Sequence, residues 1–334
     1  MDVGNRIAVV RALPGVGDML CAVPALRALR RAAPHSEITL VGLRQSSWFP
    51  ERFGPYVDHF LPCPVWPGLA EVDGPRGGAT PFLEAARRCR FDVAFQMHGC
   101  GPASNELTAA LGARRWFGLT ADPDPPDDAR GVLGRYPTDR HEVDRCSDVL
   151  ALAGITVTDQ HLEFPVTAED ERQAGELVAG GTSFAIVHPG ASRTTTRWSP
   201  IGFGHVAAHL LSVVDLVLVT GTHAEREVTG AVRTAAGAPP GLIDLAGATE
   251  IGTLAALMRR AAVVVANDTG AAHLGAAVGA SVVTVCGPSD QVRWAPRGAA
   301  TRTVGGVPFG RWPTIRQVRT AIDLALAGIT RSGS

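Results

Sequence analysis

The sequence contains no lysine, so all 31 basic residues among its 334 are arginines. Every cationic contact must therefore come from a planar guanidinium group or from histidine. The 32 acidic residues leave a net charge of −1, which gives no electrostatic footprint for nucleic acid or for an anionic membrane. No apolar run reaches the ~18 residues of a membrane span, and the N-terminal residues do not fit a signal peptide. We expect a cytoplasmic enzyme or binding protein.

Cysteine is scarce and scattered. The six cysteines form no CxxC pair, and the nearest histidine–cysteine approach, His98 and Cys100, lacks partners at zinc-like spacing. Reduced thiols are the expected state. Asp122-Pro-Asp124 has the spacing of a metal-binding pair, but its Pro- and Asp-rich surroundings indicate a turn. We therefore predict no metal site.

Short β-branched runs alternate along the chain with stretches rich in Ala, Leu and Arg. This alternation predicts two α/β halves, each with a parallel sheet covered by helices, as in Rossmann-like domains that face a cleft. We place the domains at 1–165 and 166–334, with a last helix over 312–327 that can pack back on the first domain. Ligands of such sheets bind outside the carboxyl ends of the strands.

The expected strands and helices are as follows. Strands are predicted at Arg6–Val10, Glu37–Gly42, Val57–Leu61, Arg90–Gln96, Arg114–Leu119, His161–Val166, Phe184–His188, Asp215–Thr220, Leu242–Leu245, Ala262–Ala266 and Ser281–Cys286. Helices are predicted at Gly17–Arg31, Pro81–Cys89, Pro102–Leu111, Glu142–Ala153, Ala168–Ala179, Ile201–Leu211, Ala224–Ala235, Ile251–Arg260, Gly270–Val278 and Trp312–Ala327. Pro62–Thr80 and Thr120–Tyr136 are expected to be long surface loops.

The first candidate motif, RALPGVGD at residues 11–18, directly follows the first strand. Gly15 and Gly17 would permit positive φ and a close approach of ligand to backbone. The dinucleotide-binding pattern fails, because Leu20 stands where its third glycine belongs. Asp18 has two readings: a helix N-cap, or a general base at the end of a strand.

The second motif is HPGASRTTTRW at residues 188–198, between a strand and a helix. Its small residues, hydroxyls and arginines suit a phosphate-binding loop, because guanidinium groups match phosphate oxygens in pairs. Trp198 is expected to be a packing residue. A pair of solvated arginines, Arg193 and Arg197, is the alternative.

The third motif, ANDTGAAH at residues 266–273, opens a helix rich in glycine and alanine. Asp268 or Thr269 can cap that helix, and the amides of 269–272 would point at an anion. His273 lies one turn into the helix. VCGPSD at 285–290 forms another loop after a strand, and Glu225 could accept ribose hydroxyls or could simply be a solvated residue in the first turn of a helix.

Together these segments resemble glycosyltransferase family 9, the ADP-heptose:lipopolysaccharide heptosyltransferases. The matches are GVGDMLCAVPALRALR, HPGASRTTTRWSPIGFGHVA, DLAGATEIGTLAALMRRAAVVVANDTGAAHLGAAVG and VCGPSD, spread from Arg6 to about Arg297. The resemblance implies the GT-B fold, with the acceptor on the N-terminal domain and the nucleotide-sugar on the C-terminal one. It also implies an inverting reaction that needs no metal and no cofactor beyond a nucleotide-sugar co-substrate, ADP-heptose.

The resemblance assigns roles to particular residues. Asp18 looks like the catalytic base, which removes the proton from the attacking acceptor hydroxyl. The implied donor-binding residues are Gly17, Ser192, Arg193, Thr196, Arg197, Glu225, Thr249, Asp268, Thr269, Gly270 and His273. The family usually has a lysine two residues before the tryptophan, where this chain has Thr196. We predict that Arg193 or Arg197 replaces that lysine on the diphosphate.

The acceptor is predicted from one loop. Within Pro62–Thr80, Trp66, Glu71 and Asp73 suit a neutral or cationic sugar, because aromatic faces stack on sugars and carboxylates pair with amines. His98 joins them as an acceptor-side candidate. A lysine-free, Arg-rich composition is typical of a GC-rich bacterium, which favours a soluble acceptor such as an aminoglycoside over lipopolysaccharide core.

Three alternatives stay open: a lipopolysaccharide-core heptosyltransferase, a GT-B nucleotide-sugar epimerase or hydrolase, and a non-catalytic nucleotide-sugar-binding protein. A dehydrogenase is disfavoured by Leu20. The expected partners are a nucleotide-sugar and a saccharide, with no nucleic acid and no integral membrane association. The expected oligomeric state is a monomer.

Overall fold

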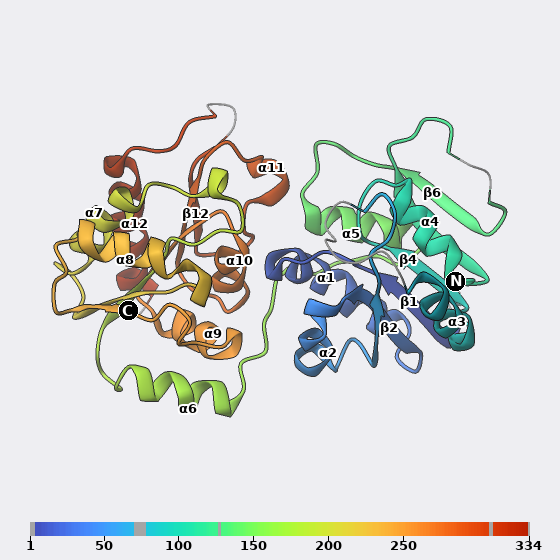
Figure 1. Cartoon of the computed structure of the whole chain (residues 1–334), viewed down its shortest axis with the longest axis horizontal. Helices are drawn as coiled ribbons and strands as arrows, with labels where there is room; N and C mark the ends of the chain where they lie inside the picture. The colour runs from blue at the N-terminus through green and yellow to red at the C-terminus, as the bar shows by residue number, and fades with distance from the viewer. Residues whose placement is uncertain (1–3, 70–77, 126–127, 307–309, 333–334) are drawn as a thin grey trace. The chain divides into compact units, whose positions relative to one another are not determined.

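The computed structural model describes residues 4–69, 78–125, 128–306 and 310–332. The chain divides into two compact units, Met1–Gln160 and His161–Ser334. Within the described residues, each unit is built on its own six-stranded sheet, in which every neighbouring pair of strands is parallel (Figure 1).

The sheet of the first unit has the strand order β3-β2-β1-β4-β5-β6. This is the order of a Rossmann-like sheet, which reverses direction beside its first strand. Val10, the last residue of β1, lies opposite Val41 in β2 and Gln96 in β4, so the loops after these strands share one edge. The strands are β1 (Arg6–Val10), β2 (Glu37–Leu43), β3 (His59–Cys63), β4 (Val93–Gln96), β5 (Arg115–Thr120) and β6 (Gly131–Arg135).

The helices of the first unit pack on this sheet and on each other. Helix α1 (Val16–Ala32) is mostly buried and packs against α5 (Glu142–Ala151), which also contacts β4 and β5. Helix α3 (Ala79–Cys89) lies on β3, and α4 (Ala103–Ala110) on β4 and β5. A short helix, α2 (Trp48–Phe53), buries Phe49 and Phe53.

The second unit repeats the same strand order, β12-β11-β10-β7-β8-β9. Its central strand, β7, pairs with both β8 and β10, as β1 does with β2 and β4. The strands are β7 (Phe184–His188), β8 (Leu216–Val219), β9 (Leu242–Asp244), β10 (Val264–Asn267), β11 (Val282–Cys286) and β12 (Thr301–Gly305).

The helices of this unit contribute apolar faces to its core. Val318 and Ile322 of the last helix pack in one cluster with Phe203 and with valines of β11. That helix contacts α7, β11 and β12, all within its own unit. The helices are α6 (Ala168–Leu177), α7 (Pro200–Leu210), α8 (Arg226–Ala235), α9 (Ile251–Arg260), α10 (Gly270–Ala277), α11 (Gln291–Trp294) and α12 (Ile315–Ser332).

Most predicted elements are present, with boundaries shifted by a few residues. One predicted strand is wrong: His161–Val166 has no regular structure. Strand β6 lies inside the stretch expected to be a loop, because pairing with β5 overrides the low strand propensity of its two glycines. Helices α2 and α11 and strand β12 were not predicted; they are short, and tertiary packing decides such segments.

Candidate active-site residues

Asp18 lies in the first turn of α1, the helix that follows β1 after the loop 11–15, and is half-buried. The helix N-cap is Gly15, so the N-cap reading of Asp18 is wrong. Positive φ was expected at both glycines, but Gly15 has φ −81° and buried Gly17 is helical, so that expectation is wrong. Gly15 is needed for space, because a Cβ there would lie 2.4 Å from Oδ2 of Asp18.

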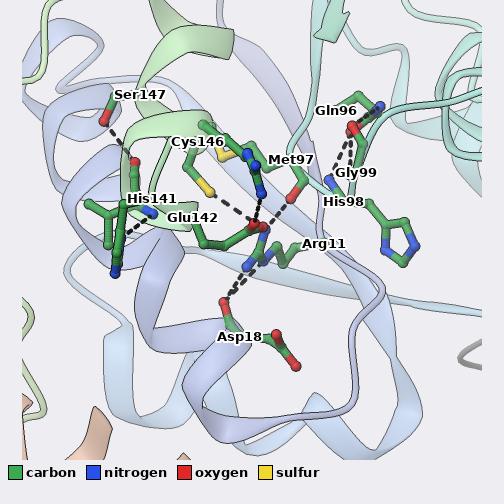
Figure 2. Close-up of polar contacts among 12 residues, drawn as sticks. Arg11, Asp18, Gln96, Met97, His98, Gly99, His141, Glu142, Cys146 and Ser147 are labelled. Atoms are coloured by element: carbon green, nitrogen blue, oxygen red, sulfur yellow. Dashed lines mark hydrogen bonds and ion pairs between the residues drawn. The ribbon is translucent and has the colours of Figure 1, made fainter. Parts of the chain in front are cut away.

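Arg11, the residue after β1, is completely buried beside Asp18. Its Nε and Nη2 donate to the backbone carbonyl of Asp18 at 3.1 and 2.6 Å, and its Nη1 donates to Oε1 of Glu142 at 2.9 Å (Figure 2). Arg145 in turn reaches Oε2 of Glu142 at 3.3 Å. Sequence analysis missed this network, because its two halves are far apart in the chain.

Of the acceptor-side candidates, the structure describes His98, after β4, and Trp66, after β3. His98 is buried in the loop after β4, where Gln96 Oε1 accepts its backbone N–H at 2.8 Å. Trp66 is half-buried and packs against the core cluster that contains Phe82 and Trp116. Glu71 and Asp73 lie outside the described residues, so the carboxylates of the predicted acceptor loop stay a prediction.

In the second unit, the buried side chain of Asn267, the last residue of β10, holds the loop after β7. Asn267 is fully buried; its Nδ2 donates to the carbonyl of Pro189 at 2.7 Å, and its Oδ1 accepts the backbone N–H of Trp198 at 2.9 Å. One amide thus holds both ends of the loop after β7. Trp198 packs edge-on against Phe203, as expected of a packing residue.

The two arginines of this loop differ in their surroundings. Nε and Nη2 of Arg197 both donate to the carbonyl of Ala191, at 2.8 and 2.6 Å, and its Nη2 lies 4.0 Å from Oε1 of Glu225. Arg193 is exposed, as is Ser192, and its carbonyl accepts from the hydroxyl of Thr196 at 2.9 Å. Arg197 therefore fastens the loop, whereas the guanidinium of Arg193 lies at its surface.

Glu225 is buried, with 8% of the residue exposed, so the reading as a solvated residue is wrong. Its Oε2 accepts the backbone N–H and the hydroxyl of Thr222, at 2.8 and 3.0 Å, in a capping box. The neighbouring His188 ring bonds the hydroxyl of Thr220 through Nδ1 at 3.0 Å. Burial lowers the pKa of His188, and the carboxylate of Glu225 opposes that effect.

The remaining donor candidates follow β9 and β10. Thr269 is the N-cap of α10 and makes no side-chain cap bond; its carbonyl accepts the N–H of Ala272 at 3.0 Å, which removes that amide from the expected anion-binding set. Burial raises the pKa of Asp268, and a hydrogen bond from Ser289 partly offsets it. Buried His273 lies in α10, which begins at Gly270, and Thr249 is half-buried before α9.

The described residues contain neither a metal-type cluster nor a membrane-spanning helix. Across the described ranges, no three His, Cys, Asp or Glu side chains come together in a group suited to a metal ion. None of the helices in those ranges is long and apolar enough to cross a bilayer. The amide of Asp124 donates to Oδ1 of Asp122 at 3.0 Å, as expected for a turn.

Comparison with known proteins gives a family. The profile of glycosyltransferase family 9 (heptosyltransferase) matches residues 83–321, although no curated protein matches the chain. A glycosyl transferase family 9 structure from Veillonella parvula is 22% identical, covers 98% of this chain and 99% of its own, and has a TM-score of 0.79.

Two structures from Escherichia coli also share the fold, each with 18% identity and a TM-score of 0.72. They are ADP-heptose lps heptosyltransferase II (97% of this chain, 99% of its own) and a heptosyltransferase with ADP (96% and 99%). The match favours glycosyl transfer over the epimerase and binding-protein alternatives. Since the family profile spans most of the chain, the protein belongs to glycosyltransferase family 9 and is a glycosyltransferase with the GT-B fold.

Proposed function

We propose that the protein transfers a heptose, or a related sugar, from ADP-heptose to a hydroxyl of a saccharide, with inversion and without a metal. The observation that carries this proposal is the environment of Glu225. Its Oε2 is tied to Thr222, while its Oε1 faces Gly190, which has no side chain to cover it. A buried carboxylate at a strand end is the group that accepts ribose hydroxyls in nucleotide-binding sheets.

The diphosphate belongs, in this proposal, to the loops after β7 and β10. The first amides of α10, at Gly270 and Ala271, would face it with the positive end of the helix dipole. Arg193 is the better replacement for the family's lysine, because the guanidinium of Arg197 is already engaged by the carbonyl of Ala191. These groups would stabilise the charge that develops on the departing ADP.

Asp18 is proposed as the general base. Its carboxylate takes the proton of the acceptor hydroxyl while that oxygen bonds to the anomeric carbon. The bond from that carbon to the diphosphate oxygen breaks on the opposite face, and ADP leaves with the bonding electron pair. Both events occur in one step, so the configuration at the anomeric carbon inverts.

For the acceptor we propose a soluble saccharide, such as an aminoglycoside intermediate, and a cytoplasmic monomer as the working form. The second candidate is lipopolysaccharide core, which is favoured by the name of the E. coli relative, a lps heptosyltransferase. Titration calorimetry with an aminocyclitol glycoside and with a phosphorylated core oligosaccharide separates the two. Binding of the core oligosaccharide alone would overturn the soluble acceptor.

The donor is tested by thermal unfolding in the presence of ADP, UDP, GDP and dTDP and their sugars. A ligand that binds only the native state raises Tm by mass action. We expect ADP and ADP-heptose to raise Tm selectively. A rise in Tm with a nucleotide of another base alone would overturn the proposal that ADP-heptose is the donor. No rise in Tm with any nucleotide would count against the donor-binding residues proposed above.

A further inference from the structure

We infer that Arg11 is a positioning residue for Asp18: it holds the backbone of the base in place from within the core. This inference rests on the proposed role of Asp18. Although Arg11 directly follows β1, it does not meet a ligand in this structure, because none of its surface is accessible. Its effect on the reaction must therefore pass through the groups that it touches.

The contacts of Arg11 join three elements. Nε and Nη2 converge on the carbonyl of Asp18 in the first turn of α1, at 3.1 and 2.6 Å. Nη1 donates to the carbonyl of Met97 after β4 and to Oε1 of Glu142, the first residue of α5, at 2.9 Å. The turn that carries Asp18 is thus fixed to the sheet and to the neighbouring helix by one rigid group.

The guanidinium of Arg11 holds Asp18 through its backbone carbonyl. Figure 2 shows the carbonyl of Asp18 facing Arg11, with the carboxylate pointing away from it. The charge of Arg11 also attracts the carboxylate of Asp18. The two bonds to the carbonyl fix the first turn of α1, and with it the place of the group that we propose as the base.

The charge of Arg11 is balanced inside the same network. Glu142 is buried between two arginines, with Arg11 on Oε1 and Arg145 on Oε2 at 3.3 Å. Arg145 is itself held by the carbonyls of Pro137 and Thr138, at 3.0 and 3.1 Å. A buried charge persists only when it is paired and hydrogen-bonded. Glu142 therefore balances the charge of Arg11 and keeps its guanidinium oriented toward Asp18.

Arg27 provides a matched control, because it is a second buried arginine and lies in α1, the helix that carries Asp18. It is also buried, and its Nη2 binds the carbonyl and the carboxylate of Asp159, at 3.2 and 3.1 Å. It lies about 13 Å further along the axis of α1 than Asp18, at 1.5 Å per residue. Replacing either arginine by lysine removes a buried guanidinium, but only Arg11 is bonded to the first turn of α1, so we expect only the change at residue 11 to loosen that turn.

The experiment compares Arg11→Lys, Arg27→Lys and Asp18→Asn in the full chain. Three quantities are measured: Tm, the affinity for ADP by calorimetry, and ADP release from ADP-heptose with water as the acceptor. Hydrogen exchange of the backbone over residues 14–20 gives a fourth readout that needs no ligand. If Arg11→Lys does not fold, Glu142→Gln replaces it, because glutamine keeps an acceptor for Nη1 but removes the balancing charge.

We expect Arg11→Lys to slow ADP release about 100-fold, as a small misplacement of a reacting group does, and to speed exchange over 14–20. Both arginine variants should lower Tm. Arg27→Lys should nevertheless leave the rate of ADP release, and the hydrogen exchange over residues 14–20, within about twofold of the parent. ADP affinity should be the same in all variants. Glu142→Gln should show the same pattern as Arg11→Lys, with ADP release slowed about tenfold.

The outcomes separate the two claims. If Asp18→Asn abolishes release while Arg11→Lys and Arg27→Lys slow it equally in proportion to Tm, Asp18 remains the base and the positioning role is wrong. If Asp18→Asn releases ADP at the parent rate, the base itself is wrong, and the inference about Arg11 falls with it. Should ADP fail to bind the parent protein, the donor proposal alone is overturned, and the exchange measurement still decides whether Arg11 holds the turn.

Discussion

Gly190 lies directly against the carboxylate of Glu225, and a Cβ on residue 190 would come within 2.3 Å of Oε1. The carboxylate is unable to swing aside cheaply, because Thr222 holds its other oxygen with two hydrogen bonds. Gly190→Ala should therefore displace Glu225 and weaken ADP binding, with a loss of about 1–3 kcal/mol of stability from overpacking. Calorimetry with ADP and thermal unfolding measure the two effects.

Gly180→Ala is the control for that change. A Cβ at Gly180 meets no atom within 4 Å, so this variant should keep both ADP affinity and Tm. Equal ADP affinity in Gly190→Ala and the parent would show that the carboxylate of Glu225 does not face the nucleotide.

The capping box of Glu225 has a twin in the same unit, which separates stability from binding. Thr167 and Asp170 form the same reciprocal pair at the start of α6. Glu225→Ala and Asp170→Ala should each lower the free energy of unfolding by about 1 kcal/mol. Only Glu225→Ala should also lower the affinity for ADP. Matching losses of ADP affinity in the two variants would mean that the loss follows from stability and not from ribose recognition.

Arg193 and Arg197 should respond differently to mutation, because only Arg197 is engaged within the protein. Arg193→Gln should leave Tm unchanged. It should weaken the binding of ADP about tenfold more than the binding of AMP, since a lost charged hydrogen bond costs about 1.5–3 kcal/mol. Arg197→Gln should lower Tm, because the carbonyl of Ala191 loses both of its guanidinium donors. A binding survey with AMP and ADP checks this. The reverse pattern would make Arg197 the diphosphate cation.

Asp128 provides a pH-dependent prediction in the first unit. Hydrogen bonds from Arg130, with a further one from the indole of Trp116, lower its pKa from the ordinary 3.8 to about 2. A carboxylate whose pKa is lowered by folding stabilises the folded state at any pH above its pKa in the unfolded chain. For Asp128 this contribution is lost as the pH falls from 3.8 toward 2. The indole N–H resonance of Trp116 should titrate with a midpoint near the pKa of Asp128.

Arg130→Gln should raise that midpoint toward 3.8, because the largest cause of the lowered pKa is then removed. The control is Arg114→Gln, which removes an exposed arginine that pairs at 3.7 Å with a different carboxylate, Asp92. If the midpoint does not move in Arg130→Gln, the arginine is not what holds Asp128 ionised.

The sequence predicted the fold well where local patterns decide it. Buried valine runs such as β7 and β11, and the polar loops that follow them, are visible in the chain without any structure, and they place Asp18, Glu225 and Asp268 after or near strands. The pattern fails for β6, which depends on pairing with β5 rather than on its own residues. It also fails for the short helices, which tertiary packing stabilises.

The candidate site was predictable in its loops and not in its interior. Arg11 and Glu142 are charged residues far apart in the chain, and each alone reads as a solvated side chain. Only the fold brings them within 2.9 Å, and only together can they be buried. Asn267 is a similar case: it lies within a recognised motif, but its role in holding the loop after β7 depends on atoms nearly eighty residues away.

The central claim, that Asp18 is the base of a transfer from ADP-heptose, is tested most directly by Asp18→Asn. The amide has nearly the same shape but does not take up a proton. We predict that release of ADP from ADP-heptose falls by roughly 10²–10⁴-fold while the Kd for ADP stays unchanged. Release at the parent rate with intact ADP binding would contradict the account.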